Sequence, residues 1–175
     1  MNHKFCFLLF TLIVFNLALR AQSGMVLSGT YPDSAETKIL VGFISKQQIT
    51  EDTVFAWYKQ NLKYSRPNKE YVDIIKPKAT DFQLILFTGT WCHDSQQIIP
   101  KYFTLLEAAG FPEQKMTIIA CDRQKNAPAN IQRPLNVVNV PTLMVMKDGK
   151  EVGRIVEYGE SGLPDKELAE IVGKM

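Results

Sequence analysis

In the second half of the chain, apolar residues occur in two kinds of pattern, one typical of strands and one typical of helices. The order of these patterns predicts the order of the secondary-structure elements. A continuous apolar run at 82–87 predicts a buried strand. The segment after it predicts a helix that ends at Gly110, with one apolar stripe. The stripe consists of Ile98, Tyr102, Leu105, Leu106 and Ala109. Pro100 interrupts this helix and predicts a kink.

Three further apolar segments complete the pattern. A buried strand is predicted at 116–120, and a second apolar run begins at Val140 and finishes in the turn 147–150. Its hairpin partner is predicted at 152–156, and a final amphipathic helix at 163–172. That helix places on one face Leu168, Ile171 and Val172. The order β-α-β and then β-β-α places the chain in the α/β class.

The candidate chemistry lies at 91–95, Trp-Cys-His-Asp-Ser, between the first strand and the helix. There the unpaired amides and the positive end of the helix dipole stabilise a thiolate, the nucleophilic form of cysteine. Burial as a small hydrophobic residue is the alternative for Cys92. Its place beside polar residues at a helix start favours a reactive thiol.

The ordered motifs resemble the thioredoxin family over 82–175. They are an apolar strand entering Trp-Cys, a proline eight residues after that cysteine, Val-Pro-Thr before a strand, Asp-Gly-Lys in a hairpin, and a glycine before the last helix. The resemblance implies a thioredoxin-like fold, a central mixed sheet flanked by helices, here with an N-terminal extension. It also implies that the Val140–Pro141 bond is cis and faces Cys92. Trp91, Val140 and Pro141 would then line the substrate groove. The motif region is also similar to extracytoplasmic members with a Cys-x-Asp-Ser motif.

Two positions depart from the family pattern. Ser95 stands where dithiol thioredoxins have their second cysteine, so the usual disulfide within the motif cannot form. Leu86 stands where the family typically has a buried aspartate that assists proton transfer. Ordinary dithiol chemistry is therefore not expected.

The polar motif residues each have two interpretations. Ser95 either caps the helix or hydrogen-bonds the thiolate of Cys92. His93 either tunes the thiolate or is simply exposed to solvent. Asp94 is interpreted as a helix-dipole acid, and its negative charge would oppose thiolate formation.

Cys121 ends the second predicted core strand. Parallel neighbouring strands bring their carboxyl ends to one edge of a sheet, so we expect Cys121 near Cys92. A disulfide needs Cα atoms within about 7 Å, which adjacent strands do not guarantee. Cys121 is therefore either a free, partly buried thiol or a second thiol that resolves or regulates Cys92.

The first residues predict export. Residues 1–4 are positively charged, 5–19 are almost continuously apolar, and 19–21 resemble a cleavage signal, as in a secretory signal peptide at 1–21. The apolar run is shorter than the roughly 20 residues that a spanning helix needs. A retained N-terminal anchor is the alternative. We expect a periplasmic or otherwise exported protein.

Composition limits the remaining functions. Loss of 1–21 removes Lys4 and Arg20 and no acid, so the net charge of +2 falls to zero, which gives no support for nucleic-acid binding. The mature chain keeps two cysteines and one histidine, too few for a typical four-ligand zinc site. No metal or bound cofactor is expected.

The predicted N-terminal extension covers 22–79, and the thioredoxin-like domain covers 80–175. Within the extension we expect a strand at 39–44 and helices at 53–62 and 69–76, packed on the core. Four aromatic residues are interpreted as core and interface packing, with client recognition as the alternative: Trp57, Tyr58, Tyr64 and Tyr71.

These observations predict an exported, single-cysteine thiol–disulfide oxidoreductase that acts through a mixed disulfide on Cys92. Its partners would be exported protein thiols or disulfides and an upstream thiol electron donor. The rival interpretation is a non-catalytic thioredoxin-like module whose groove binds clients without turnover. Absence of a second motif cysteine favours the module, and presence of Cys92 favours the enzyme.

Overall fold

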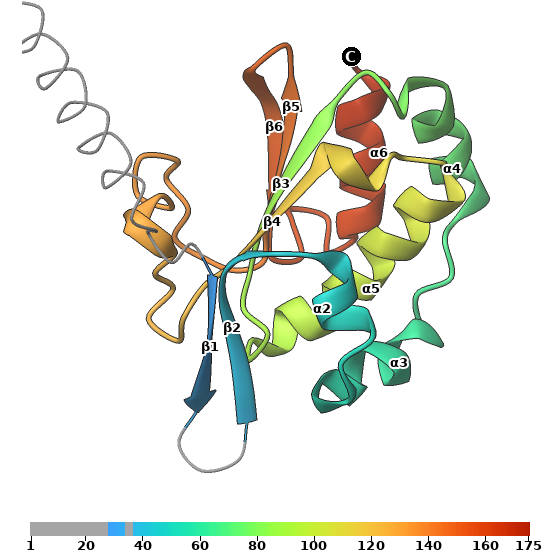
Figure 1. Ribbon diagram of the computed structural model, residues 1–175. Coiled ribbons are helices and arrows are strands. Elements are labelled where there is room, and N and C mark those ends of the chain that lie inside the picture. Colours follow the sequence, from blue (N-terminus) through green and yellow to red (C-terminus); the bar gives the residue numbers. More distant parts are fainter. Residues whose placement is uncertain (1–27, 34–36) are drawn as a thin grey trace, which may run out of the picture.

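The computed structural model describes residues 28–33 and 37–175, and in this part of the chain the strands form one mixed sheet (Figure 1). Its order is β1-β2-β4-β3-β5-β6. The strands are β1 Ser28–Asp33, β2 Thr37–Ile44, β3 Gln83–Thr88, β4 Met116–Ala120, β5 Thr142–Lys147 and β6 Lys150–Val156. The helices are α2 Lys46–Thr50, α3 Ala56–Leu62, α4 Lys69–Ile75, α5 His93–Ala108 and α6 Pro164–Gly173. Short 3₁₀ turns lie at Thr53–Phe55, Lys76–Lys78, Glu113–Lys115 and Pro128–Asn130. The predicted signal peptide lies outside the described residues.

The strand directions confirm the predicted α/β arrangement. Strands β3 and β4 are parallel, with Leu86 opposite Ile118, and α5 makes the crossover between them. The other neighbouring pairs are antiparallel. Because β5 runs against β3 with Thr142 opposite Phe87, the start of β5 lies at the carboxyl end of β3. The segments before α5 and before β5 therefore meet at one edge of the sheet.

Side chains of β3 and β4 alternate between two apolar clusters, as the period of two in a strand requires. Leu86 and Ile118 belong to the larger cluster, which also contains the buried side of α5. Phe87 and Ile119 belong to a second cluster on the other face of the sheet. In Figure 1, α4, α5 and α6 lie on one side of the sheet, and the segment between β4 and β5 lies on the other.

Helix α5 continues through Pro100, which cannot donate a backbone hydrogen bond to the carbonyl of Gln96. The amide of Asn61, at the end of α3, donates to this carbonyl at 2.9 Å. The helix ends as predicted, with Gly110 at a φ of 71° and the Phe111 N–H bonded to the Leu106 carbonyl. The N-terminal region thus supplies the Gln96 carbonyl with a hydrogen bond in place of the one that Pro100 cannot donate.

The described part of 22–79 packs on the rest of the molecule through one continuous core. Ile49, Phe55 and Tyr58 are buried in the larger cluster, and Trp57 and Tyr71 pack against it. The prediction that the four aromatic residues pack in the core or at an interface is wrong for one of them. This residue, Tyr64, is 68% exposed, and its ring lies under the Lys63 ammonium group.

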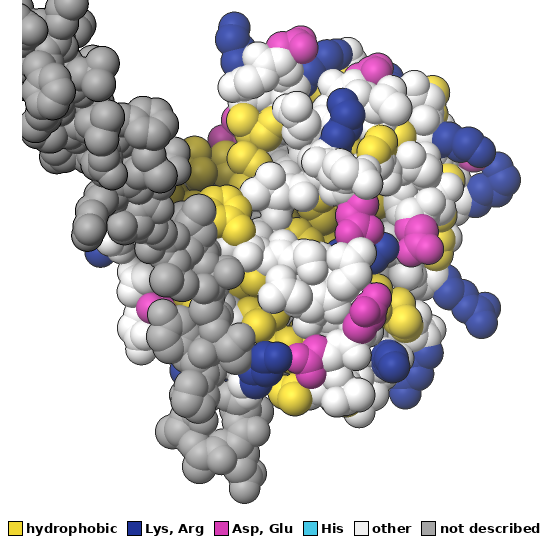
Figure 2. All heavy atoms as spheres, in the orientation of Figure 1, with side chains coloured by type: hydrophobic (Ala, Val, Ile, Leu, Met, Phe, Trp, Pro, Cys, Tyr) yellow, Lys and Arg dark blue, Asp and Glu magenta, His cyan; other side chains and the backbone are white. Residues whose placement is uncertain are grey.

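Charged side chains of both signs are interspersed on the face drawn in Figure 2. Ion pairs of the described residues include Lys69 with Asp73 and Lys46 with Glu107. Exposed pairs of this kind contribute little to stability, on the order of 0–1 kcal/mol. Neither sign of charge dominates this face.

Candidate active site

Cys92 occupies the N-cap position of α5, at the edge where β3 ends. Its backbone is extended, with a φ of −81° and a ψ of 125°, and its N–H donates to the Gly89 carbonyl at 2.9 Å. Its own carbonyl accepts the first helical hydrogen bond, from Gln96. The side chain is half-buried, and Sγ donates to the Val140 carbonyl at 3.1 Å. The thiol therefore combines partial access with a helix N-terminus.

The segment that faces Cys92 is the entry to β5. The Val140–Pro141 peptide bond is cis, and both residues are buried. The Pro141 carbonyl accepts from the N–H of Glu157 at 2.7 Å, which connects this segment to the turn after β6. Val140 thus touches the thiol, while Pro141 connects the site to the end of the sheet.

Trp91, next to Cys92 in sequence, packs against the same apolar cluster as the thiol. Its indole N–H donates to the Cys121 carbonyl at 2.9 Å, and the guanidinium group of Arg123 lies 5.7 Å from the ring centroid. A Cβ added to Gly89 would lie 2.8 Å from the indole, so only glycine fits beneath the ring without a shift. These contacts hold the aromatic ring beside Cys92.

The predicted site residues Ser95 and His93 differ in their exposure to solvent. Ser95 is fully buried, and its hydroxyl accepts from the Gly89 N–H at 3.3 Å. Its hydrogen-bond partner is thus a backbone amide, whereas the partner of Cys92 is Val140. His93 is exposed at the first position of α5.

Cys121 is fully buried in the second apolar cluster, against which Cys92 and Trp91 also pack. Both Cys92 and Cys121 are free cysteines. Burial, together with the negative charge of Asp122, raises the pKa of Cys121 to about 12. At neutral pH this thiol is protonated and therefore a poor nucleophile.

The site includes a threonine that the sequence did not single out. The hydroxyl of buried Thr90 accepts from the Leu40 N–H at 3.1 Å, so β2 holds the loop that leads to Cys92. The Gln96 side chain donates to the Thr90 carbonyl at 2.9 Å. No local pattern identifies this contact, because Leu40 and Thr90 lie 50 residues apart in sequence.

A tyrosine after β6 also reaches the site. Burial raises the pKa of Tyr158, as do the charges of Asp94 and Cys92 and a hydrogen bond with the Asp94 carboxylate. The tyrosine is 37% exposed and follows Glu157, which is bonded to Pro141. The glycine that precedes the last helix marks this turn in the sequence, but nothing there indicates that the turn meets α5.

Among the described residues, no group of three or more histidine, cysteine, aspartate or glutamate side chains is placed to hold a metal ion. In the same part of the chain, the helices are too short or too polar to cross a membrane.

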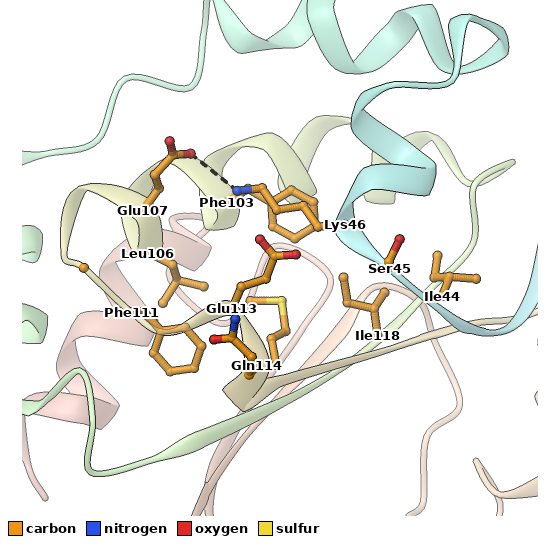
Figure 3. Close-up of a pocket in the computed structure, with 12 residues that line it drawn as sticks. Ile44, Ser45, Lys46, Phe103, Leu106, Glu107, Phe111, Glu113, Gln114 and Ile118 are labelled. Carbon is orange, nitrogen blue, oxygen red and sulfur yellow. Dashed lines mark hydrogen bonds and ion pairs between the residues drawn. The ribbon is translucent and has the colours of Figure 1, made fainter.

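A hollow of about 560 Å³ lies elsewhere, between α2, the second half of α5 and β4 (Figure 3). Phe103, Leu106 and Phe111 line its apolar side, and Lys46 and Glu107 form an ion pair at its rim. Cys92 and Phe103 are 11 positions apart on α5, roughly 16 Å along the axis. The hollow is separate from the thiol.

Comparison with known proteins identifies a family model and several relatives. The thioredoxin family model matches residues 64–172. A thioredoxin of Staphylococcus aureus is 35% identical over 109 residues, which cover 58% of this chain and 96% of the relative. A thioredoxin of Staphylococcus saprophyticus is 34% identical over 91 residues, which cover 52% of this chain and 79% of the relative.

A solved structure shares the fold at low sequence identity. This crystal structure of an HIV epitope-scaffold has a TM-score of 0.51 and 16% identity, and the match covers 69% of this chain and 82% of that one. Strands β1 and β2 and helices α2 and α3 precede the region that matches the family model.

Proposed function

Because the chain belongs to the thioredoxin family, with a thioredoxin fold, we propose that this thioredoxin-like redox protein is a single-cysteine thiol–disulfide oxidoreductase. One observation carries the proposal. Cys92 is a half-buried thiol at the start of α5, while Ser95 occupies the position of a second motif thiol and Cys121 is fully buried. A single accessible thiol forms mixed disulfides and cannot close a disulfide within the motif.

The reaction begins with attack of the Cys92 thiolate on one sulfur of a client disulfide. The client S–S bond breaks, a new S–S bond joins Cys92 to the client, and the departing client thiolate takes up a proton. A thiolate of the client, or a separate small or protein thiol, then attacks the mixed disulfide and releases Cys92. When the client thiol attacks, the cycle isomerises the disulfide without net reduction.

Two other reactions fit the same thiol. With a glutathionylated protein, Cys92 accepts the glutathione and the protein leaves as a thiol; a second glutathione thiol then restores Cys92 and forms glutathione disulfide. With a sulfenic acid, the thiol condenses to a disulfide and releases water. Each reaction takes its reducing equivalents from external thiols.

Cys121 has no part in resolving the mixed disulfide in this scheme. Its raised pKa, about 12, leaves almost no thiolate at neutral pH. Its burial in the second cluster also excludes a client thiol from it. A thiol of the client or of another molecule must therefore complete the cycle.

The roles of the remaining site residues follow from their contacts. The ring of Trp91 and the Val140–Pro141 segment would shape the groove that receives the client, because both flank Cys92. Ser95 supports the loop through Gly89, and exposed His93 meets the client at the groove margin.

The exported setting belongs to the same proposal. The positive charge of residues 1–4 and the apolar residues 5–19 support a cleaved signal peptide, and the Cys-x-Asp-Ser motif is similar to that of extracytoplasmic relatives. The clients would then be exported proteins. Mass spectrometry of the protein recovered from its native host tests this point, since a mature chain beginning near residue 22 is expected.

The function is tested with a labelled peptide disulfide and mass spectrometry of the products. The wild type is expected to form a peptide mixed disulfide on Cys92, and added glutathione should release it. In Cys121→Ser the adduct should persist as long as in the wild type, within about twofold, since no internal thiol resolves it. A quantitative Cys92–Cys121 bond, with adducts accumulating only in Cys121→Ser, would contradict the mechanism. Peptide binding that is unchanged in Cys92→Ala, without any exchange, would instead establish a binding module.

A further inference from the structure

Lys125 brings a cation to the segment that faces Cys92. It lies in the turn 122–126 after β4, and its ammonium group donates to the side-chain carbonyl of Asn139 at 2.7 Å. The next residue, Val140, accepts the hydrogen bond of the Cys92 thiol at 3.1 Å. Because the Cα atoms of consecutive residues are about 3.8 Å apart, the ammonium group and the sulfur lie on the order of 10 Å from each other.

The ammonium group of Lys125 is half-buried and forms no ion pair with another described residue. The acid nearest to it along the chain, Asp122, accepts instead from the N–H and the side-chain amide of Asn126, at 2.8 and 3.4 Å. An ammonium group has three donors, and Asn139 uses one of them. A half-buried cation without a counter-ion favours an anionic ligand, because pairing offsets part of the cost of its burial.

Residues of opposite charge are bonded to the two ends of the segment that faces the thiol. Lys125 is bonded to Asn139, the residue before Val140. The N–H of Glu157 donates to the carbonyl of Pro141, the residue after Val140, at 2.7 Å. A client chain that lies along this segment would therefore meet a cation toward one end and an acidic residue toward the other.

We propose that Lys125 is a specificity-determining residue that favours clients with a carboxylate close to the reacting sulfur, on the side that lies nearer Asn139. The inference rests on the proposed function, since it takes exchange at Cys92 as the reaction. A carboxylate roughly two or three residues from the client cysteine spans the distance to the ammonium group, because an extended chain rises about 3.3 Å per residue. The carboxylates of a glutathione adduct offer the same chemistry on a shorter chain.

Other charged groups stand near the site, so the test must separate a local contact from net charge. Arg123 lies over the Trp91 ring, and His93 and Asp94 begin α5. Replacement of Lys125 leaves all of these residues in place. A peptide whose carboxylate is moved from one side of its cysteine to the other keeps its net charge and changes only its distance from the lysine.

The test compares exchange at Cys92 with four disulfides of one otherwise neutral peptide. Three are mixed disulfides with mercaptoethanol, and they carry aspartate before the cysteine, aspartate after it, or asparagine at both positions. The fourth is the glutathione disulfide of the asparagine peptide. Each initial rate is divided by the rate with dithiothreitol, which corrects for the intrinsic reactivity of the disulfide. In the wild type at low salt, one aspartate isomer should exceed the asparagine peptide by about two- to fivefold, the range of exposed charge interactions.

The variants assign this gain to Lys125. Lys125→Gln should bring the favoured isomer to within about 1.5-fold of the asparagine peptide, whereas Lys125→Arg should keep the gain because it keeps the charge. The asparagine peptide itself should react within about twofold of its wild-type rate in both variants, which shows that the site is intact. Lys150→Gln is the matched control, because this exposed lysine pairs with Lys147, at the end of β5 far from Cys92. High salt should reduce the gain in the wild type, since it screens exposed charges.

Three outcomes would overturn the inference. They are a wild type in which no carboxylate-bearing disulfide outpaces the asparagine peptide, an equal gain for both aspartate isomers, and a gain that survives in Lys125→Gln. A gain for one aspartate isomer that Lys125→Gln removes assigns the carboxylate to the client. The same result for the glutathione disulfide alone assigns it to the adduct.

Binding of the same peptides with serine in place of cysteine, measured by fluorescence anisotropy, requires no exchange. Binding that favours one aspartate isomer and loses this preference in Lys125→Gln, without exchange of any disulfide, would remove the proposed function alone. Exchange at equal rates with all four disulfides would remove this inference alone.

Discussion

Cys92 and Cys121 contact the same apolar cluster from two different elements of the fold. Cys92 begins a helix of 16 residues, is half-buried, and bonds the carbonyl of Val140. Cys121 follows a strand, is fully buried, and has the charge of Asp122 beside it. The helix N-terminus favours a thiolate, whereas burial and a neighbouring anion disfavour one. Within one small region, the surroundings therefore leave one thiol half-buried at a helix N-terminus and enclose the other completely.

Removal of each sulfur in turn tests the difference between the two cysteines most directly. Cys92→Ser should reduce exchange with a peptide disulfide by at least about a hundredfold, because the thiolate is the nucleophile. Cys121→Ser should keep exchange within about twofold of the wild type, since its thiol takes no part. Initial rates of exchange at neutral pH check both. Equal losses in the two variants would show that the sulfurs act together.

A second thiol introduced beside Cys92 should form a disulfide with it, as Cys121 is not expected to do. In Ser95→Cys the two motif thiols stand three positions apart at the start of α5, where they should form a reversible disulfide. Net reduction of a protein disulfide by a dithiol should then rise by roughly tenfold. Insulin turbidity and thiol counting after oxidation measure this. Ser95→Ala is the control, because it removes the hydroxyl without adding a thiol; a folded Ser95→Cys protein that forms no motif disulfide would contradict the placement.

Burial of Cys121 should appear as a pH dependence of stability. Its pKa rises from the ordinary value of 9.0 to about 12 in the folded state, so between these values the unfolded chain loses a proton that the folded protein keeps. This contribution is fully present below about pH 9 and is lost as the pH rises toward 12. The free energy of unfolding of the wild type, minus that of Cys121→Ala, should fall by about 1.4 kcal/mol per pH unit above pH 9.

Urea unfolding under reducing conditions at pH 7.5, 9.5 and 10.5 measures this difference, in which other titrating groups cancel. A difference that stays constant over this range would place Cys121 in contact with solvent.

The smallest expected effect concerns the loop that holds Cys92 in place. Thr90→Val removes the acceptor of the Leu40 N–H and should lower the free energy of unfolding by about 1–2 kcal/mol. Thr90→Ser keeps the hydroxyl and serves as the control. Hydrogen exchange should show the Leu40 amide less protected in the valine variant only. Equal protection in both variants would mean that β2 does not hold this loop.

Local patterns in the sequence predicted the elements of the second half of the chain well. Strand β4 coincides with the predicted 116–120, and α5 ends at Ala108, two residues before the predicted Gly110. Apolar side chains recur about every two residues in a strand and about every 3.6 residues in a helix, so a few neighbouring residues suffice to reveal the pattern. Exposure of Tyr64 was not predictable in this way, because an isolated aromatic residue carries no period.

The contacts across the site escaped prediction for the same reason. The hydrogen bonds of Thr90 with Leu40 and of Asn61 with Gln96 each join segments far apart in the chain. Pro100 shows the limit well. The sequence indicates that Pro100 leaves the Gln96 carbonyl without its helical hydrogen-bond donor, but not that the side-chain amide of Asn61 takes the place of that donor.

The sequence by itself determined the class of fold, the place of Cys92 at a strand-to-helix junction, and the absence of a second motif thiol at Ser95. The tertiary structure decided which thiol is accessible, since Cys121 is buried only where the second apolar cluster closes over it. It also brought Leu40 of β2 to Thr90, in the loop that leads to Cys92. The physical reason is that strand and helix periods are local, whereas burial and charge proximity depend on all segments that meet at one point.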